Sequence, residues 1–159
     1  RRAGHWSARY GMQPDKIAAC FMLFNEIGII EQLSRTLFQD RLPDGVLVSH
    51  FSVLNHLTRV QDGQTPLTLA NAFQVPKTTM THTLSGLEKR GLVRLAPNPA
   101  DGRSKCVWLT DEGKAFRQQA IMALAPDMMK MVGTIDMDDV AKILPTLTAV
   151  RAYLDKARD

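Results

Sequence analysis

The stretch from Thr65 to Thr110 constrains this chain most, because two short helical patterns are followed there by two extended runs. Thr65 suits a helix N-cap, and Pro66 suits the first helical turn. The helix that follows has its apolar residues at helical spacing, at Leu67, Ala70 and Phe73. Pro76 ends this helix, since a proline disfavours helical geometry at the residue before it.

A second helix is predicted for residues 77–89, directly after the break. Its apolar residues fall on one face, at Met80, Leu84 and Leu87. The other face carries short hydrogen-bonding or basic side chains: Lys77, Thr78, Thr79, Thr81, His82 and Ser85. Such a face can approach a polyanion closely and read base edges in a major groove. Gly91 suits the left-handed residue that ends a helix.

The two extended runs, Leu92–Ala96 and Lys105–Leu109, predict a β-hairpin. The segment between them, from Pro97 to Ser104, is rich in turn-forming residues and is expected to be a loop. Asp101 lies two residues before Arg103, so an ion pair can hold the guanidinium in a fixed direction. The hairpin therefore carries a basic tip.

The positive charge of the chain is concentrated in this region. The whole protein has a net charge of +4, and the stretch from Lys77 to Lys105 contains six basic and two acidic side chains. The remainder is therefore neutral. A basic surface confined to the helix and the hairpin is the pattern expected of a phosphate-contacting face. The alternative is a solvated basic face without a partner.

These residues together resemble the winged helix-turn-helix of the MarR family of dimeric, ligand-responsive transcriptional regulators. The resemblance rests on the two helices, the Gly91-Leu92-Val93 run, the Asp101-Gly102-Arg103 wing and the run Leu109–Gly113. It implies a mainly α fold with a small β-hairpin wing, flanked by N- and C-terminal dimerisation helices. It also implies a repressor that binds a pseudo-palindromic operator in double-stranded DNA as a homodimer and is released by a small aromatic or lipophilic effector.

The resemblance and the charge pattern together assign the expected DNA contacts. Base contacts are expected from Thr81, His82 and Ser85, and contacts at the start of the helix from Lys77, Thr78 and Thr79. Phosphate contacts are expected from Arg94 and Lys105 on electrostatic grounds. Arg103 resembles the family's wing arginine, which enters the minor groove, with Asp101 orienting it. Members of the family often have an arginine where His82 stands, so weaker contacts are expected at this position.

The flanking segments are predicted to form the dimer. Residues 16–40 are helical in spacing but apolar around much of the helix, which suggests burial against a partner subunit. Residues 110–157 hold further helices, of which the last has a seam of apolar residues at 3–4 spacing. Residues 46–109 then form the DNA-binding domain. Residues 1–15 lack periodicity and are expected to be an extension or a cloning remnant, with Met12 as a candidate start.

The effector is expected between the dimerisation helices and the DNA-binding domain, as the resemblance implies. The candidate lining residues are Phe24, His50, Phe51, His56 and Met122. A methionine-rich stretch, Met122 to Met131, offers flexible side chains that can line a cavity, although ordinary core packing is the favoured interpretation.

Other functions are less favoured by the sequence. The four histidines and two cysteines have no triad-like or metal-like spacing, and no glycine-rich phosphate loop is present. Neither an enzyme nor a cofactor or metal site is therefore expected. Two alternatives remain: a winged helix that contacts protein without specific DNA binding, and a redox-sensing regulator that uses Cys20. Residues 17–30 are interrupted by polar residues and are expected to be too short to span a bilayer, which favours a cytoplasmic protein.

Overall fold

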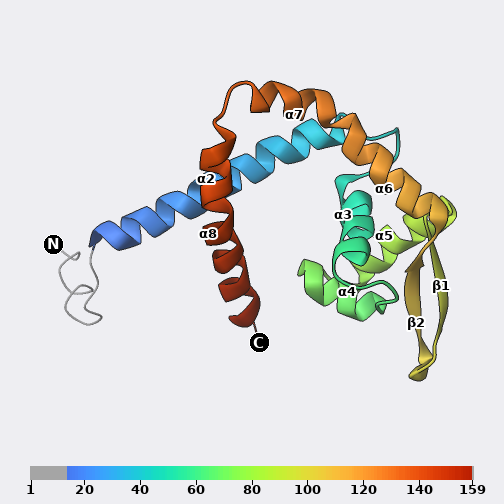
Figure 1. Ribbon diagram of the computed structural model, residues 1–159. Coiled ribbons are helices and arrows are strands. Elements are labelled where there is room, and N and C mark those ends of the chain that lie inside the picture. Colours follow the sequence, from blue (N-terminus) through green and yellow to red (C-terminus); the bar gives the residue numbers. More distant parts are fainter. Residues whose placement is uncertain (1–13, 159) are drawn as a thin grey trace.

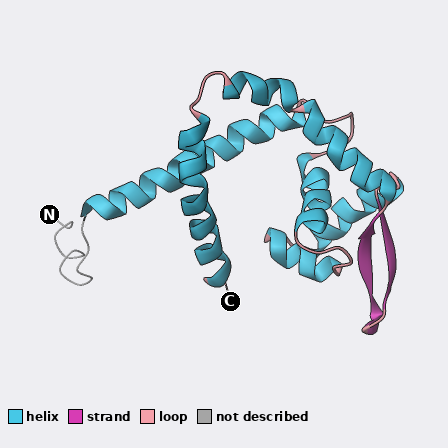
Figure 2. Cartoon of the chain, in the orientation of Figure 1, coloured by secondary structure: helices cyan, strands magenta, loops and turns pink. Residues whose placement is uncertain are grey.

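The computed structural model describes residues 14–158 and is mostly helical, with one two-stranded antiparallel hairpin in this range (Figures 1 and 2). The described elements are α2 (Pro14–Gln39), α3 (Val48–Arg59), α4 (Pro66–Phe73), α5 (Lys77–Lys89), β1 (Val93–Asn98), β2 (Asp101–Leu109), α6 (Asp111–Ala123), α7 (Ala125–Val132) and α8 (Met137–Lys156). The expected fold class is confirmed. The expectation for residues 1–15 lies almost wholly outside the described residues.

One apolar core joins α3, α4, α5 and the hairpin. Its buried members are Val53, Leu54, Leu57, Leu69, Ala70, Met80, Leu84, Leu87, Leu92, Val93, Val107 and Leu109. The three apolar residues expected on one face of α5 all belong to it, with exposed fractions of 3% or less. Burial of such side chains contributes about 1.5–3 kcal/mol each. The core therefore fixes how α5 is rotated about its own axis.

The turn between α4 and α5 follows the sequence prediction closely. The Thr65 hydroxyl accepts a hydrogen bond from the Thr68 amide at 3.2 Å, and Pro66 occupies the first turn of α4. Gln74 then adopts a left-handed conformation with φ of 53°, which ends α4 before Pro76. Gly91, with φ of 69°, redirects the chain after α5 into β1.

The hairpin is longer than the sequence predicted. The strands continue to Asn98 and begin again at Asp101, so the expected loop from Pro97 to Ser104 is wrong. Asn98 explains the difference, because its side-chain amide donates to Ser104 Oγ at 2.9 Å and its side-chain oxygen accepts from the Ala100 amide at 3.0 Å. The register shifts between Pro97 and Asn98, and this irregularity accommodates the extra residues of β2.

Helices α6 and α7 leave the hairpin and arch over the domain (Figure 1). The Thr110 hydroxyl caps α6 by accepting from the Gly113 amide at 2.9 Å, and it donates to the Gly91 carbonyl at 2.6 Å. The two helices are separated at Leu124, and Pro126 lies in the first turn of α7. Pro126 suits this place, because a proline is tolerated in the first turn of a helix.

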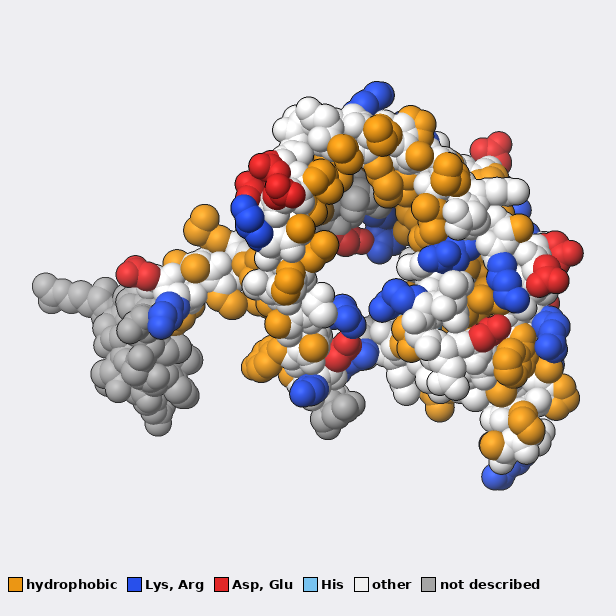
Figure 3. Space-filling model, viewed as in Figure 1, with side chains coloured by type: hydrophobic (Ala, Val, Ile, Leu, Met, Phe, Trp, Pro, Cys, Tyr) orange, Lys and Arg blue, Asp and Glu red, His pale blue; other side chains and the backbone are white. Residues whose placement is uncertain are grey.

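Helices α2 and α8 project away from the core and expose apolar residues (Figures 1 and 3). On α2 these include Ile17, Phe21, Met22, Phe24, Ile29, Ile30, Leu33 and Leu37, and on α8 they include Ile143, Leu144, Tyr153 and Leu154. Helix α2 is 26 residues long. By length and composition alone, its segment Asp15–Gln39 is long and apolar enough to cross a membrane. The expectation that this segment is too short is therefore wrong, because the helix continues through its polar residues.

The residues after α8 return to the domain formed by α3, α4, α5 and the hairpin. The Arg158 guanidinium donates to the carbonyl oxygens of Asn71 at 3.1 Å and Ala72 at 3.4 Å, in the last turn of α4. It also pairs with Asp155 at 2.8 Å. A cation at the carboxyl end of a helix is electrostatically favourable.

Gly113 gives a stability test of the junction between α6 and β1. A Cβ at this position would overlap the backbone oxygen of Leu92, which cannot move aside cheaply. We expect Gly113→Ala to lower the free energy of unfolding by about 1–3 kcal/mol, as overpacking does. Gly133→Ala is the matched control, because its nearest neighbour would be the Lys130 oxygen at 3.6 Å. Urea denaturation of both variants checks this; equal stability of the two would contradict the assigned contact.

Candidate nucleic-acid interface

The outer face of α5 is free of the core and is polar. Lys77, Thr78, Thr79, Thr81 and His82 are exposed, and Ser85 is half-buried, so the structure brings these six expected contact residues onto one surface. The Thr81 hydroxyl donates to the Lys77 carbonyl at 2.9 Å. Its oxygen keeps its acceptor capacity and can accept a hydrogen bond from a base amino group.

The amino end of α5 has no side-chain cap. Pro76 occupies the cap position and offers no side-chain acceptor, and the first turn has no acidic residue. The first amide groups of the helix therefore remain available, together with the positive end of the helix dipole. This end of α5, with Lys77 beside it, is suited to bind a phosphate group.

The wing tip carries the expected pair of charges. Asp101 Oδ1 accepts from the Arg103 amide at 3.0 Å and lies 3.6 Å from Arg103 Nε. The Arg103 side chain is 96% exposed, so the ion pair sets its direction without burying it. The expected arrangement of these two residues is thus present in the structure.

The arms of the hairpin carry two more exposed cations. Arg94 stands opposite Trp108 in the register, and its guanidinium carbon lies 5.8 Å from the centre of the Trp108 ring. This contact holds Arg94 along the hairpin rather than free in solvent. Lys105 lies opposite Pro97, nearer the tip. Both side chains are available for backbone phosphates.

The base of the wing is fixed to the loop before α4. Asp62 Oδ1 accepts from the amides of Gly63 and Leu109, both at 3.0 Å. The Val107 amide donates to the Gln64 carbonyl at 2.9 Å, and the Gly63 amide donates to the Val107 carbonyl at 3.0 Å. A side chain at Gly63 would overlap the Trp108 ring, so this close approach requires glycine. Sequence reasoning missed this clamp, although an Asp-Gly pair before the helix was the available signal.

His50 has a structural part in the same domain. Its side chain is 7% exposed, and its Nδ1 accepts from the Leu47 amide at 2.9 Å at the start of α3. A Cβ on Gly86 of α5 would lie 2.7 Å from His50 Nε2, so the two helices meet closely here. Burial lowers the pKa of His50, and the nearby Arg90 and His82 lower it further. His50 is therefore held neutral.

The five residues expected to line an effector site lie on different helices of the described chain, and their common pocket stays a prediction. Phe24 is exposed on α2, and Met122 is 60% exposed on α6. Phe51 packs edge-on against Phe38, with ring centres 4.5 Å apart. His56 bonds to the Gln64 side chain at 3.1 Å and packs on Phe73. These contacts, with the burial of His50, place the five on separate surfaces.

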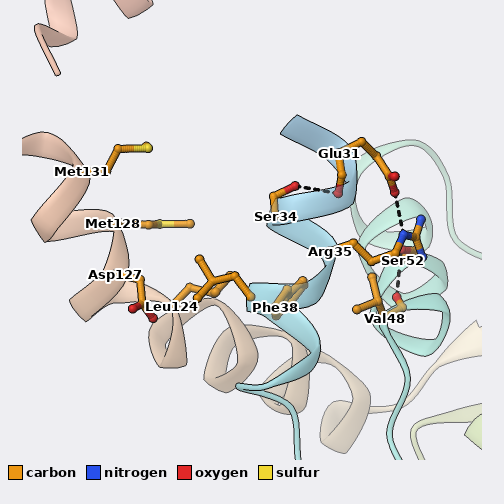
Figure 4. Close-up of a pocket in the computed structure, with 11 residues that line it drawn as sticks. Glu31, Ser34, Arg35, Phe38, Val48, Ser52, Leu124, Asp127, Met128 and Met131 are labelled. Carbon is orange, nitrogen blue, oxygen red and sulfur yellow. Dashed lines mark hydrogen bonds and ion pairs between the residues drawn. The ribbon is translucent and has the colours of Figure 1, made fainter. Parts of the chain in front are cut away.

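A different cavity, of about 400 Å³, lies between α2, α3 and α7 (Figure 4). Its apolar lining residues are Leu37, Phe38, Val48, Leu124, Met128 and Met131, and its polar ones are Glu31, Ser34, Arg35, Ser52 and Asp127. Arg35 pairs with Glu31 at 2.6 Å, and Asp127 pairs with Arg41 at 2.8 Å. The hydrogen bond from Arg41 lowers the pKa of Asp127 and keeps it ionised. The methionine-rich stretch was the sequence signal for this cavity, and ordinary core packing is wrong for Met128 and Met131.

The cysteines have different surroundings. Cys20 is exposed on α2, whereas Cys106 is buried in β2 and packs within the hairpin. Within residues 14–158, no group of three or more metal-ligating side chains lies together.

Comparisons with known proteins point in one direction. A family model described as MarR family matches residues 44–104. The transcriptional regulator HosA of Escherichia coli O111:H- is 32% identical over 98 residues, which cover 62% of this chain and 71% of HosA.

Solved structures agree with this match. The transcriptional regulator BldR from Sulfolobus solfataricus superposes with a TM-score of 0.74 and 25% identity, over 89% of this chain and 99% of BldR. A cysteine-to-serine mutant of MarR from E. coli, complexed with operator DNA, gives a TM-score of 0.66 and 26% identity, over 83% of this chain and 95% of that one.

The buried state of His50 predicts how stability depends on pH. The folded protein holds the pKa of His50 below its unfolded value, so the unfolded chain binds the proton first as the pH falls below about 6.5. We expect the urea midpoint to fall between about pH 7 and pH 5, and His50→Gln to flatten that fall. A wild-type midpoint that is constant over this interval, or an unchanged slope in the variant, would contradict the assignment.

Proposed function

The chain belongs to the MarR family of DNA-binding transcriptional regulators, and on this premise we propose that it is a repressor that binds a pseudo-palindromic operator as a homodimer and is released by a small-molecule effector. One observation carries this proposal: the uncharged-to-basic face of α5 is exposed beside an arginine-tipped wing. In this arrangement α5 enters a major groove and the wing lies along the adjacent minor groove.

The roles of the individual residues follow from their positions. Thr81, His82 and Ser85 lie along the middle of α5 and contact base edges. Lys77, Thr78 and Thr79 lie at its amino end, where they contact phosphates or base edges. On the hairpin, Arg94 and Lys105 contact the DNA backbone and Arg103 reaches into the minor groove.

A homodimer is supported by the apolar surfaces of residues 16–40 and 110–157. Phe21, Leu33 and Ile143 are each more than half exposed in the single chain. Contiguous apolar surface of this kind marks an interface. Two copies related by a twofold axis present their α5 helices to successive major grooves, about 34 Å apart. Residues 46–109 then act as the DNA-binding unit.

An effector is supported by the cavity between α2, α3 and α7 rather than by the five residues named from the sequence. Its walls are mostly apolar, and its polar groups come from a few side chains, a composition typical of small-molecule sites. Because α2 and α7 belong to the proposed dimerisation region and α3 to the DNA-binding domain, a ligand here contacts both. A small aromatic or lipophilic compound fits this lining.

The test of the DNA-binding surface begins with selection of bound sequences from random duplexes. With the selected operator, we expect Arg103→Ala to weaken binding by about 1–3 kcal/mol, mainly for operators with A·T-rich flanks. Lys105→Ala is the comparison, since a phosphate contact weakens all duplexes about equally and lowers the salt slope by about 1. Fluorescence anisotropy measures both; unchanged operator affinity for Arg103→Ala would refute its role.

The dimer is tested by size. We expect the purified protein to elute as a dimer at micromolar concentration and Leu33→Glu to elute as a monomer, because the substitution places a charge in the apolar face of α2. Gln32→Glu, on an exposed neighbouring position, is expected to remain dimeric. A strictly monomeric wild-type protein would remove the proposed mode of operator binding.

The effector site is tested with a compound selected from aromatic and lipophilic candidates for releasing the protein from its operator. Met128 lines the cavity, so we expect Met128→Trp to fill it and to abolish the response while DNA affinity is retained. Met122 lies outside the lining, and Met122→Trp is expected to respond like the wild type. The reverse pattern would return the site to the residues inferred from sequence.

A further inference from the structure

A second groove, of about 500 Å³, runs between the start of α3 and the carboxyl half of α5. It is distinct from the cavity proposed for the effector, since the two share no lining residue. Basic and hydrogen-bonding side chains dominate it: His50, His82, Ser85, Lys89 and Arg90. No acidic side chain lines it.

His50 presents an N–H group to this groove. Its Nδ1 accepts a hydrogen bond from the Leu47 amide at 2.9 Å, so the neutral ring carries its proton on Nε2. Among the described residues Nε2 has no hydrogen-bond partner, and the side chain is more than nine-tenths buried. Gly86 keeps this nitrogen uncovered, because a Cβ there would lie 2.7 Å from it. No enclosed side-chain nitrogen or oxygen among the described residues lacks a partner, so Nε2 is accessible from the groove, where a bound acceptor can reach its N–H.

The cations around His50 Nε2 are also without a compensating carboxylate in the described chain. Lys89 and Arg90 take part in none of its ion pairs, which are formed by other residues. The described hydrogen bond of the Arg90 guanidinium runs from Nη2 to the backbone oxygen of Asp44, at 3.4 Å. Two full positive charges therefore face the groove with their charge unneutralised, beside a neutral N–H donor.

We propose that this groove binds a phosphate group, held by the His50 Nε2–H and by the charges of Arg90 and Lys89. An oxyanion supplies the acceptor that Nε2 lacks and the negative charge that the two cations lack, with charge-assisted hydrogen bonds of the stronger kind. The phosphate comes either from the DNA backbone beside α5 or from a free anion. His82 lies both in this groove and on the proposed DNA-facing surface of α5. A phosphate bound in the groove therefore lies beside a side chain that is proposed to contact DNA.

The first experiment uses inorganic phosphate and the DNA-free protein, and it does not depend on the proposed function. The ring nitrogen signals of the histidines are followed by NMR while phosphate replaces chloride at constant ionic strength. We expect a saturable shift of His50 Nε2, while His56, whose Nε2 is already bonded to Gln64, serves as the internal reference. Absence of a saturable His50 shift, or an equal response to chloride, overturns the proposal.

Two variants test the cations without altering the core. Arg90→Gln and Lys89→Gln are each expected to weaken phosphate binding about tenfold, the loss of one charge-assisted hydrogen bond. Arg59→Gln removes an exposed cation at the far end of α3 and is expected to bind phosphate like the wild type. Equal affinities of all three variants would mean that only general screening is observed, and this also overturns the site.

The source of the phosphate is resolved with the selected operator, an arm that rests on the proposed function. If a DNA phosphate occupies the groove, bound operator abolishes the His50 response to inorganic phosphate and Arg90→Gln weakens DNA binding. If a free anion is the ligand, the response persists in the complex or phosphate displaces the DNA more than chloride does. Failure to select any operator would refute the proposed function and leave the phosphate titration of the free protein valid.

Discussion

The rotation of α5 about its axis is the constraint on which the remaining structure depends. Met80, Leu84 and Leu87 are buried against α3, α4 and the hairpin, and their transfer from water supplies several kilocalories per mole. A helix has only one orientation that buries all three, so its opposite face must be exposed. The exposed polar face of α5 is therefore a consequence of core packing rather than of any contact that the surface residues make themselves.

The wing depends on a different kind of interaction, which is directional. Asp62 receives two backbone amides, and the segment Gly63-Gln64 pairs with Val107, so the base of the hairpin is held by hydrogen bonds as well as by its buried residues. The tip extends from this base with Arg103 almost fully exposed. The hydrogen-bonded base therefore fixes where the exposed tip stands relative to α5.

Local signals made most of this fold predictable, whereas contacts between distant segments did not. The cap at Thr65, the break at Pro76 and the spacing of the α5 leucines are properties of neighbouring residues, and the structure agrees with each. The hairpin was expected too short because the Asn98–Ser104 hydrogen bond joins its two arms across the turn. The cavity was not predictable for the same reason: it is formed by α2, α3 and α7, and the Arg41–Asp127 pair beside it joins residues 86 positions apart.

The contact of Arg158 with the last turn of α4 closes the molecule into a ring. From the DNA-binding domain the chain leaves through α6, passes along α7 and α8, and returns to that domain through two hydrogen bonds, leaving a visible opening in the centre (Figure 3). The hydrogen bonds of Arg158 that close this ring contribute only about 1 kcal/mol. A displacement of α8 must either move α4 with it or break these hydrogen bonds. The two hydrogen bonds of Arg158 thus limit how far α8 can move relative to α4.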